Sequence, residues 1–514
     1  MTISSLEVPG AGGGVMASRL SEDPQTKVLL IEAGSSDFMD QNILVPNFAS
    51  RLPNSKFVPG LDNRVIEYPR GHVLGGSTAI NQMEYSRGSR DDFGRWARVT
   101  EDDGWTWDEL LPYIFKMEMV TPPPDHHNTS GQFNPALHGT KGPVATSVEG
   151  LSLPIDALGR EASSQLHEQF PFNLDYNSGD TIGISWVQST IKASNLDILV
   201  NTQVTKVLPV GTGEKEKEPV IRGVQFAQSA NGTRFSLNAT KEVILSAGAV
   251  KTPHLLMLSG IGDTAYLSSM GMEPLIDLPA VGQNLQDHVY LPNSWTVNST
   301  NTLDNLRLNA TLAAEALDLW RVNSTGPLGL GPASQFGWLR VPQNSSVAGP
   351  TSAHFELILH DQYSTRTVPA PSEGHFFSIA TNVISPTSRG NISLASLDPF
   401  VSPVINPNLL GTSLDVAIPR EAIKAARAFV SAPAWEGYIT GEFGQFADAK
   451  TDEEIEAYAR ANSDTVDHVV GTPFIISGHT QTPTYVLAER AADLVRRHGR
   501  NRTIVHISPP LTRP

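Results

Sequence analysis

The chain has 514 residues, of which 39% are hydrophobic and 18% charged, and its formal net charge is −16. This length favours a globular protein of two or more lobes, and the acidic balance argues against nucleic acid or an anionic membrane surface as a partner, because both attract Lys/Arg patches. No apolar run reaches the roughly 18 residues of a bilayer-spanning helix, and the lack of cysteine excludes disulfides, thiolate catalysis and cysteine-based metal sites.

The first organised unit runs from the glycine-rich stretch GAGGGVMASRL to KVLLIEAG. It predicts a turn, a helix and a short buried strand over residues 28–31, which is the order of a βαβ dinucleotide-binding unit. Glu32 follows that strand 22 residues after Gly10, which suits an acid for the ribose hydroxyls. Gly10 and Gly13 take the second and third glycine positions, whereas Val8 takes the first, and the preceding ISSLE predicts a poor buried strand. The alternative interpretation is a glycine-rich, disordered N-terminus.

The second unit is YPRGHVLGGSTAIN, residues 68–81. Its paired glycines, Gly75 and Gly76, allow the backbone to approach a ligand or to adopt positive φ. Free N–H groups in such a turn can hold an anion or a polar ring edge. An ordinary surface loop is the alternative for the glycines, and a helix cap is the alternative for Asn81.

Later segments alternate between strand and helix patterns. Residues 195–210 and 223–250 predict strands with a hairpin, and residues 241–262 predict a strand, a glycine turn and a helix. Between residues 300 and 460, TLAAEALDLW predicts an amphipathic helix, while HFELILH and HFFSIATNVISP predict strands. The stretch DEEIEAYARA predicts a helix whose acidic start suits the macrodipole.

These units, together with YSRGSRDDFGRWA, VGQNLQDH and the histidines of DHVVGT and SGHTQTP, resemble the glucose–methanol–choline oxidoreductases over most of the chain. The fungal aryl-alcohol oxidase branch is the most similar in pattern. The resemblance implies an α/β, two-lobed flavoprotein with a Rossmann-like FAD-binding domain and a substrate domain of antiparallel sheet plus helices. The implied FAD domain comprises residues 1–110, 181–290 and 466–500, the substrate domain comprises residues 111–180 and 291–465, and residues 501–514 form a tail.

The resemblance also implies how FAD is held. The glycines would seat its pyrophosphate, an acid would bind the adenosine ribose, and the loop of residues 70–81 would lie along the isoalloxazine. The implied residues are Gly10, Gly13, Glu32, Ala33, Arg70, Val73, Gly75, Gly76, Asn81 and, through its backbone, Val204. Non-covalent binding is expected, because the family's covalent members use a His near GGS and His72 lies earlier in the loop.

The activity implied is oxidation of a small primary alcohol, aryl or allylic, by hydride transfer to flavin N5, with oxygen or a quinone as electron acceptor. His468 matches the family's base, a role that suits imidazole because its ordinary pKa lies near the operating pH. His479 matches the residue that hydrogen-bonds the substrate oxygen. Other histidines are expected to be structural or at the surface, among them His72, His254, His288 and His360.

The C-terminal histidine region departs from the family pattern. His468 and His479 are 11 residues apart, where family members carry a longer segment with a strand, and the strand-like residues 503–507 are a candidate to fill that position. Asp467 stands where an aromatic residue is usual, and a carboxylate near the ring would raise the pKa of His468. A truncated, catalytically inactive member with weak or no FAD binding is therefore the alternative. A nicotinamide dehydrogenase would rest on the glycine-rich turn alone, and nothing favours a pure binding module.

Sequons of the N-x-[ST] type are more frequent than chance, which gives about four. They predict a secreted glycoprotein, while the start MTISSLEVPGAGGG shows no signal peptide. The nine positions are Asn128, Asn231, Asn238, Asn298, Asn309, Asn323, Asn344, Asn391 and Asn501.

Overall fold

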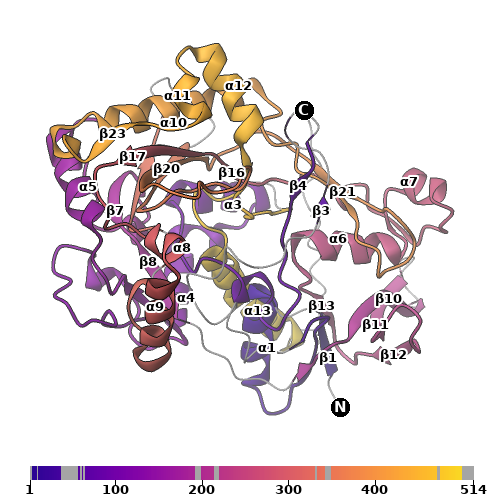
Figure 1. Cartoon of the computed structure of the whole chain (residues 1–514). Coiled ribbons are helices and arrows are strands. Elements are labelled where there is room, and N and C mark those ends of the chain that lie inside the picture. Colours follow the sequence, from indigo (N-terminus) through magenta and orange to yellow (C-terminus); the bar gives the residue numbers. More distant parts are fainter. Residues whose placement is uncertain are drawn as a thin grey trace.

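Figure 1 shows the computed structural model of the chain. It describes residues 3–7, 10–35, 56–57, 61, 64–191, 198–212, 219–329, 331, 333–341, 349–471 and 475–500. A four-stranded sheet and an eight-stranded sheet are its largest sheets, and they lie in different parts of the molecule. The α/β fold expected from the sequence is therefore present, and the site lies where segments from both parts meet.

The four-stranded sheet is parallel and has the order β13-β1-β2-β9, with bounds Ile3–Glu7 (β1), Lys27–Ile31 (β2), Ile198–Leu199 (β9) and Val243–Leu245 (β13). Helix α1 (Ala11–Ser21) carries the chain from β1 to β2. The expectation of a poor strand at residues 3–7 is wrong, because Ser5 pairs with Leu29 on one side and with Val243 on the other. Backbone pairing on both sides overrides a weak intrinsic β-propensity. Val8 lies outside the described residues.

A three-stranded antiparallel sheet confirms the predicted hairpin. It consists of β10 (Gln203–Thr212), β11 (Pro219–Ala227) and β12 (Phe235–Asn238). The predicted strand, turn and helix are β13 followed by α6 (Gly248–Leu258), whose first residue has a φ of 77°. The chain continues through β14 (Ile261–Gly262), α7 (Thr264–Ser269) and β15 (Ile276–Asp277). These elements gather at the right of Figure 1.

The eight-stranded sheet is antiparallel in every described pairing. Its order is β23-β17-β20-β19-β18-β7, with β16 paired to β20 and β24 paired to β16. The two strands predicted from sequence, β19 (Phe355–His360) and β20 (Phe376–Val383), are buried along their whole length, and α10 (Ser413–Val430) packs against both. The other strands are β7 (Gly183–Trp186), β16 (Val289–Tyr290), β17 (Pro292–Val297), β18 (Gln335–Leu339), β23 (Ile439–Glu442) and β24 (Asp464–Thr465).

The helices predicted near residues 310 and 452 are confirmed as α9 (Ala310–Asn323) and α12 (Asp452–Asn462), and Thr451 forms a capping box at the acidic start of α12. The remaining helices are α3 (Arg90–Thr100), α4 (Trp107–Met117), α5 (Pro154–Gln165), α8 (Asn305–Leu308), α11 (Gln445–Asp448) and α13 (Gln481–Arg500). The remaining strands are β3 (Lys56–Phe57), β4 (Ile66–Glu67), β5 (Glu118–Val120), β6 (Val144–Val148), β8 (Gln188–Ile191), β21 (Asn391–Ser393) and β22 (Val404–Asn406).

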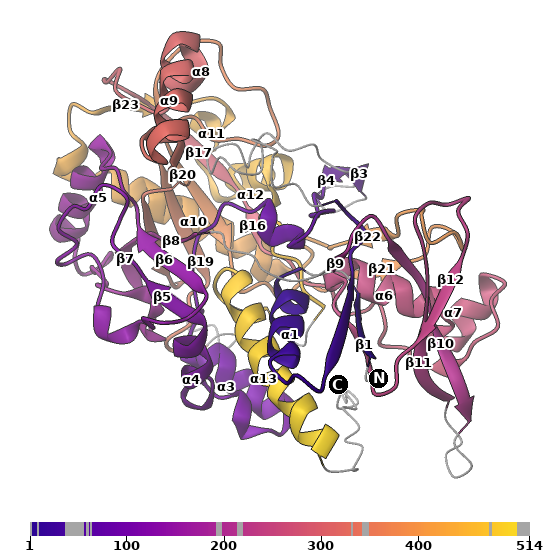
Figure 2. The same ribbon diagram turned by 90° about the horizontal axis from the view of Figure 1, so that it is seen from below.

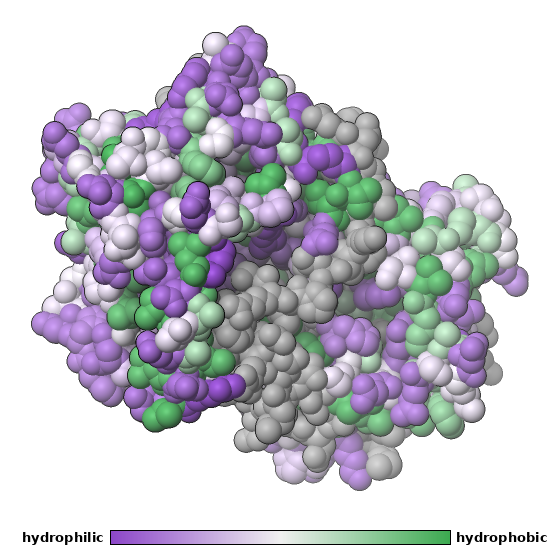
Figure 3. Space-filling model, viewed as in Figure 1, coloured by the Kyte–Doolittle hydropathy of each residue, from purple (hydrophilic) through white to green (hydrophobic). Residues whose placement is uncertain are grey.

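The surface carries mixed hydropathy. On the face in Figure 3, hydrophobic residues form small groups between hydrophilic ones. Within the described ranges, no helix is long and apolar enough to cross a membrane.

Candidate active site

The loop of residues 70–81 packs by its backbone on the start of α1. Gly76 begins a short 3-10 helix (Gly76–Ala79) with a φ of 56°, and a Cβ added to it would lie 2.9 Å from the Cα of Gly10. A Cβ on Gly71 would lie 2.2 Å from the backbone of Gly76. Gly75 also has a positive φ, of 93°. Glycine is thus required here for close approach of two backbone segments. The positive φ values agree with the sequence prediction, and approach of this backbone to a ligand stays a prediction.

Glu32, which directly follows β2, is a buried acid with one carboxylate oxygen that has no hydrogen-bond partner among the described residues. Glu32 is 0% exposed, and its Oε1 accepts a hydrogen bond from the backbone N–H of Gly34 at 2.6 Å, while Oε2 has no hydrogen-bond partner among the described residues. Burial raises the pKa of Glu32 to about 7. A buried carboxylate oxygen of this kind needs a donor from a ligand or from water.

Other expected cofactor residues lie around Glu32. Thr202 donates its backbone N–H to the Glu32 carbonyl at 2.8 Å, which brings the start of β10, with buried Val204, beside the end of β2. Ala33 follows Glu32, and a parallel bridge joins Ser35 to Val73. Segments from three regions of the sequence thus meet outside the carboxyl end of β2, where ligands bind in open α/β sheets. Gly13 is buried within the first turn of α1.

His468 and His479 come together in space. His468 lies just after β24 and His479 just before α13, and their ring centroids are 5.0 Å apart with an interplanar angle of 45°. Between His468 and His479, the described residues form no strand, and their β-type pairing is an isolated bridge between Val470 and Gln286. The segment 503–507, a candidate for the family's strand, lies outside the described residues.

A third histidine, His288, contacts the first of these two. Its Nδ1 lies 3.0 Å from Nδ1 of His468, and the two rings meet edge to face at 80°. His288 is 0% exposed. From the sequence, His288 is expected to be structural or at the surface. Its position in the VGQNLQDH block is the one local signal of this contact.

Two buried carboxylates flank His479. Its Nε2 lies 3.0 Å from Oε1 of Glu356, and its Nδ1 lies 3.6 Å from Oε2 of Glu84. Burial opposes charge on the ring, yet Glu356 and Glu84 outweigh it and raise the pKa of His479 to about 9. Burial raises the pKa of Glu84 to about 7, and its Oε1 is buried without a hydrogen-bond partner among the described residues. Neither carboxylate was singled out from the sequence.

The pKa of His468 is shifted in the opposite direction to that of His479. Burial and then the positive charge of His479 hold the pKa of His468 well below its ordinary value. The expectation that Asp467 would raise the pKa of His468 is wrong. The Asp467 carboxylate pairs with Arg366 at 2.7 Å and Arg70 at 3.4 Å, so two guanidinium groups compensate it.

Arg70 and Asn81 link the loop to the C-terminal segments. A guanidinium N–H of Arg70 donates to the Asp467 carbonyl at 2.8 Å. Asn81 donates its side-chain amide to Oε1 of Gln481, the first residue of α13, and accepts from the Met83 N–H at 3.2 Å. Asn81 therefore sits between the 3-10 helix and α13, next to the helix that follows His479.

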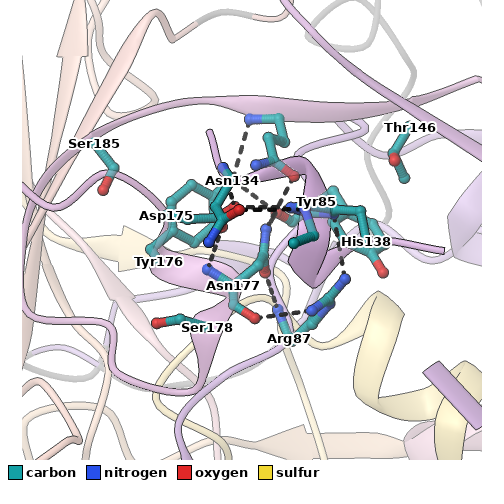
Figure 4. A network of polar contacts seen from close by, with 12 residues as sticks. Tyr85, Arg87, Asn134, His138, Thr146, Asp175, Tyr176, Asn177, Ser178 and Ser185 are labelled. Atoms are coloured by element: carbon teal, nitrogen blue, oxygen red, sulfur yellow. Dashed lines mark hydrogen bonds and ion pairs between the residues drawn. The ribbon is translucent and has the colours of Figure 1, made fainter. Parts of the chain in front are cut away.

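A buried polar network holds the segment after Asn81 (Figure 4). Arg87 pairs with Glu118, and their side chains are 1% and 0% exposed. Arg87 also donates to the Asn177 carbonyl at 2.9 Å, and the His138 ring lies 2.7 Å from Glu118 and 2.8 Å from Asp175. Each charge has a partner, as buried charges require. The network fixes the backbone that carries Glu84 into the site, and its long-range pairings left no local signal in the sequence.

The chain is similar to known proteins over most of its length. The profile of the GMC oxidoreductase family matches residues 10–290 and 386–475. Dehydrogenase eriK of Hericium erinaceus is 34% identical and aligns over 95% of this chain and 93% of its own length. Pyranose dehydrogenase 3 of Leucoagaricus meleagris is 32% identical over 95% and 91%. The structure of an FAD-dependent oxidoreductase from Chaetomium thermophilum superposes with a TM-score of 0.83 at 25% identity, over 97% of this chain and 99% of that one.

Proposed function

The chain belongs to the glucose–methanol–choline oxidoreductase family, whose members act on CH–OH groups with FAD, and on that premise we propose that it oxidises a primary alcohol with His468 as the base. The observation that carries the proposal is the His468–His479 pair. Two imidazoles 5.0 Å apart have pKa values shifted in opposite directions. Such divergence between neighbouring titratable groups is typical of acid and base assignments in a catalytic site.

The residues present fit FAD. Gly10 is the N-cap of α1, which has no side-chain cap and no acid in its first turn, so its N–H groups and dipole suit a pyrophosphate. A Cβ on Gly10 would meet nothing within 4 Å. Oε2 of Glu32 suits the hydroxyls of a ribose, and the start of β10 at Val204 lies beside it. When bound, FAD accepts the hydride that leaves the alcohol carbon.

His468 and His479 have different roles in the proposed reaction. His468 is neutral at physiological pH and only half-buried, so it takes the hydroxyl proton of the substrate. His479 is held as an imidazolium by Glu356, and its charge stabilises the negative charge that develops on the substrate oxygen. Arg70 and Arg366 neutralise Asp467 beside the base.

The test is the visible spectrum of the protein after incubation with FAD and desalting. Retained flavin that bleaches anaerobically with benzyl or cinnamyl alcohol supports the proposal. His468→Ala should keep the flavin spectrum and slow bleaching by about 10²–10⁴-fold, while Glu168→Ala, at an exposed position of the substrate part, should bleach as the parent does. Protein that binds no FAD, or binds it and never bleaches, would favour the inactive family member instead.

The aryl or allylic alcohol expected from the sequence has one rival substrate class. Oε1 of Glu84 is a buried acceptor without a partner among the described residues, one side chain away from His479. It suits a substrate with a second hydroxyl donor, as in a sugar, and relatives named pyranose dehydrogenase are consistent with that class. A site built to bond a hydroxyl rejects analogues that lack it. Glu84→Leu should therefore lower kcat/KM for D-glucose far more than for benzyl alcohol if the sugar class is right, and affect both alike if it is not.

The proposal has three further points: how FAD is bound, which electron acceptor reoxidises it, and whether the protein is secreted. FAD is bound non-covalently, so acid precipitation should release it into the supernatant. The reduced flavin passes its electrons to oxygen or to a quinone, which oxygen consumption and benzoquinone reduction distinguish.

The third point is that the chain is a secreted glycoprotein. Among the sequons in the described ranges, six asparagines are exposed and Asn391 is half-buried. The exposed ones are Asn128, Asn231, Asn238, Asn298, Asn309 and Asn323. Removal of N-glycans from protein secreted by a fungal host should therefore produce a clear decrease in mass.

A further inference from the structure

His288 is the group that faces the non-reacting side of the proposed base. Its Nδ1 lies 3.0 Å from Nδ1 of His468, at hydrogen-bond distance. His288 is 0% exposed, whereas His468 is half-buried, so His468 and not His288 is the ring on the substrate side. Within the described part of the chain, Nδ1 is the ring nitrogen of His468 that is hydrogen-bonded.

The contact restricts the tautomers of both rings. Two neutral imidazoles that meet Nδ1 to Nδ1 must be complementary, since one nitrogen has to carry hydrogen and the other has to offer a lone pair. If His288 donated, His468 would carry its hydrogen on Nε2 and could not accept a proton there. If His288 accepts, His468 carries hydrogen on Nδ1, and its Nε2 lone pair is free.

The role proposed for His468 decides between the two arrangements. A base that takes the hydroxyl proton needs a free lone pair, and Nδ1 of His468 is turned to His288. The free lone pair therefore lies on Nε2 of His468, its hydrogen lies on Nδ1, and Nδ1 of His288 is the acceptor. The hydrogen of His288 is then on its Nε2, which is buried and has no hydrogen-bond partner among the described residues.

We infer that His288 is a positioning residue for the alcohol oxidation: it accepts the Nδ1–H of His468 and so presents the Nε2 lone pair of His468 to the substrate hydroxyl. The inference rests on the proposed function of His468 as the base. The charged groups that face His468 from the surrounding elements are His479, Arg70 and Arg366, with Asp467 beside them. His479, Arg70 and Arg366 are positively charged and favour a neutral His468. In a neutral imidazole, the tautomer decides which nitrogen can accept a proton.

The experiment compares three variants by anaerobic stopped-flow reduction of bound flavin with the best alcohol found for the parent protein. His288→Asn places an amide near the position of Nδ1, which can accept from His468, whereas His288→Leu cannot accept and His288→Gln places its amide near Nε2 instead. The rate at saturation should fall about 10- to 100-fold in His288→Leu, part of the general-base contribution, with little change in the apparent Kd of the alcohol. His288→Asn should recover most of the rate.

The solvent isotope effect is a second readout, and it should rise in His288→Leu because proton removal becomes slower relative to hydride loss. His254→Leu, which removes a buried histidine of α6, should leave both readouts unchanged. If His288→Leu does not retain flavin, the Asn and Gln variants carry the comparison, and equal rates for these two would overturn the inference. Parent-like reduction by His288→Leu would also overturn it, while His468→Ala still tests the base separately.

Discussion

Arg19 of α1 and Glu489 of α13 form an ion pair between residues 470 positions apart in the sequence, in which one N–H of Arg19 contacts both carboxylate oxygens of Glu489. The Arg19 Nε–H donates to Oε1 of Glu489 at 2.7 Å and to Oε2 at 2.9 Å, and the Glu489 side chain is 1% exposed. Figure 2 shows the two helices side by side. The pair joins α1, whose start is the proposed pyrophosphate site, to α13, which follows His479, so the proposed cofactor site and the proposed catalytic site depend on the same ion pair.

Glu489→Ala should therefore destabilise the protein strongly. It leaves Arg19 without its buried partner and removes a contact of Lys116 at 3.2 Å. Breaking a buried pair from one side costs about 3–5 kcal/mol. Glu22→Ala is the matched control, because Glu22 also pairs with Arg19, at 2.6 Å, but is 45% exposed, and such pairs contribute about 0–1 kcal/mol. Urea unfolding monitored by far-UV circular dichroism gives both values, and equal losses would mean that the pair is not a support.

Gly76→Ala should abolish FAD retention. Its Cβ would lie 2.9 Å from the Cα of Gly10, so the loop has to move away from the start of α1. Gly131→Ala separates this effect from backbone strain, since Gly131 has a φ of 81° but open space around its Cβ. Both alanines carry the cost of a left-handed backbone, about 1 kcal/mol, yet Gly131→Ala should retain FAD. The measurement is flavin per protein after desalting, and retention by Gly76→Ala would show that the loop does not need this approach.

Glu32→Ala should weaken FAD binding without unfolding the protein. A hydrogen bond to a charged group contributes about 1.5–3 kcal/mol, which corresponds to an increase in Kd of about 10- to 100-fold. Titration of flavin-free protein with FAD, followed by quenching of flavin fluorescence, gives the Kd. Glu168→Ala serves again as the exposed control. An unchanged Kd would remove Glu32 from the cofactor site.

Stability should fall as the pH rises through the pKa of His479. The folded pKa of about 9 lies above the ordinary 6.5, so the protonated ring stabilises the fold fully below pH 6.5, and that contribution is lost as the pH approaches 9. The shift corresponds to about 3 kcal/mol. Between these two pH values the free energy of unfolding of the parent should therefore fall by that much more than that of His479→Gln. If the free energy of unfolding had the same pH dependence in both proteins, Glu356 and Glu84 would not be stabilising a positive charge on His479.

The amino-acid sequence by itself determined the family, the FAD cofactor and several of the helices and strands, because these depend on local features. Gly76 permits the close approach of the loop backbone to Gly10, and the strand-like segments of β10, β11, β19 and β20 encode strands. The site residues expected from motifs, His468 and His479, are adjacent in space, and their catalytic roles stay predictions.

Only the tertiary structure decided the electrostatics of the site and the pairing of weak strands. Residues 3–7 form a central strand because two neighbours pair with them, and Asp467 does not charge His468 because Arg366 reaches it from 101 positions away. Glu84, Glu356 and His288 surround the two histidines through contacts between residues far apart in the sequence: 123 positions separate Glu356 from His479, and 180 positions separate His288 from His468. The pKa of a buried group depends on burial and on every charge near it in space, and chain folding alone brings those charges together.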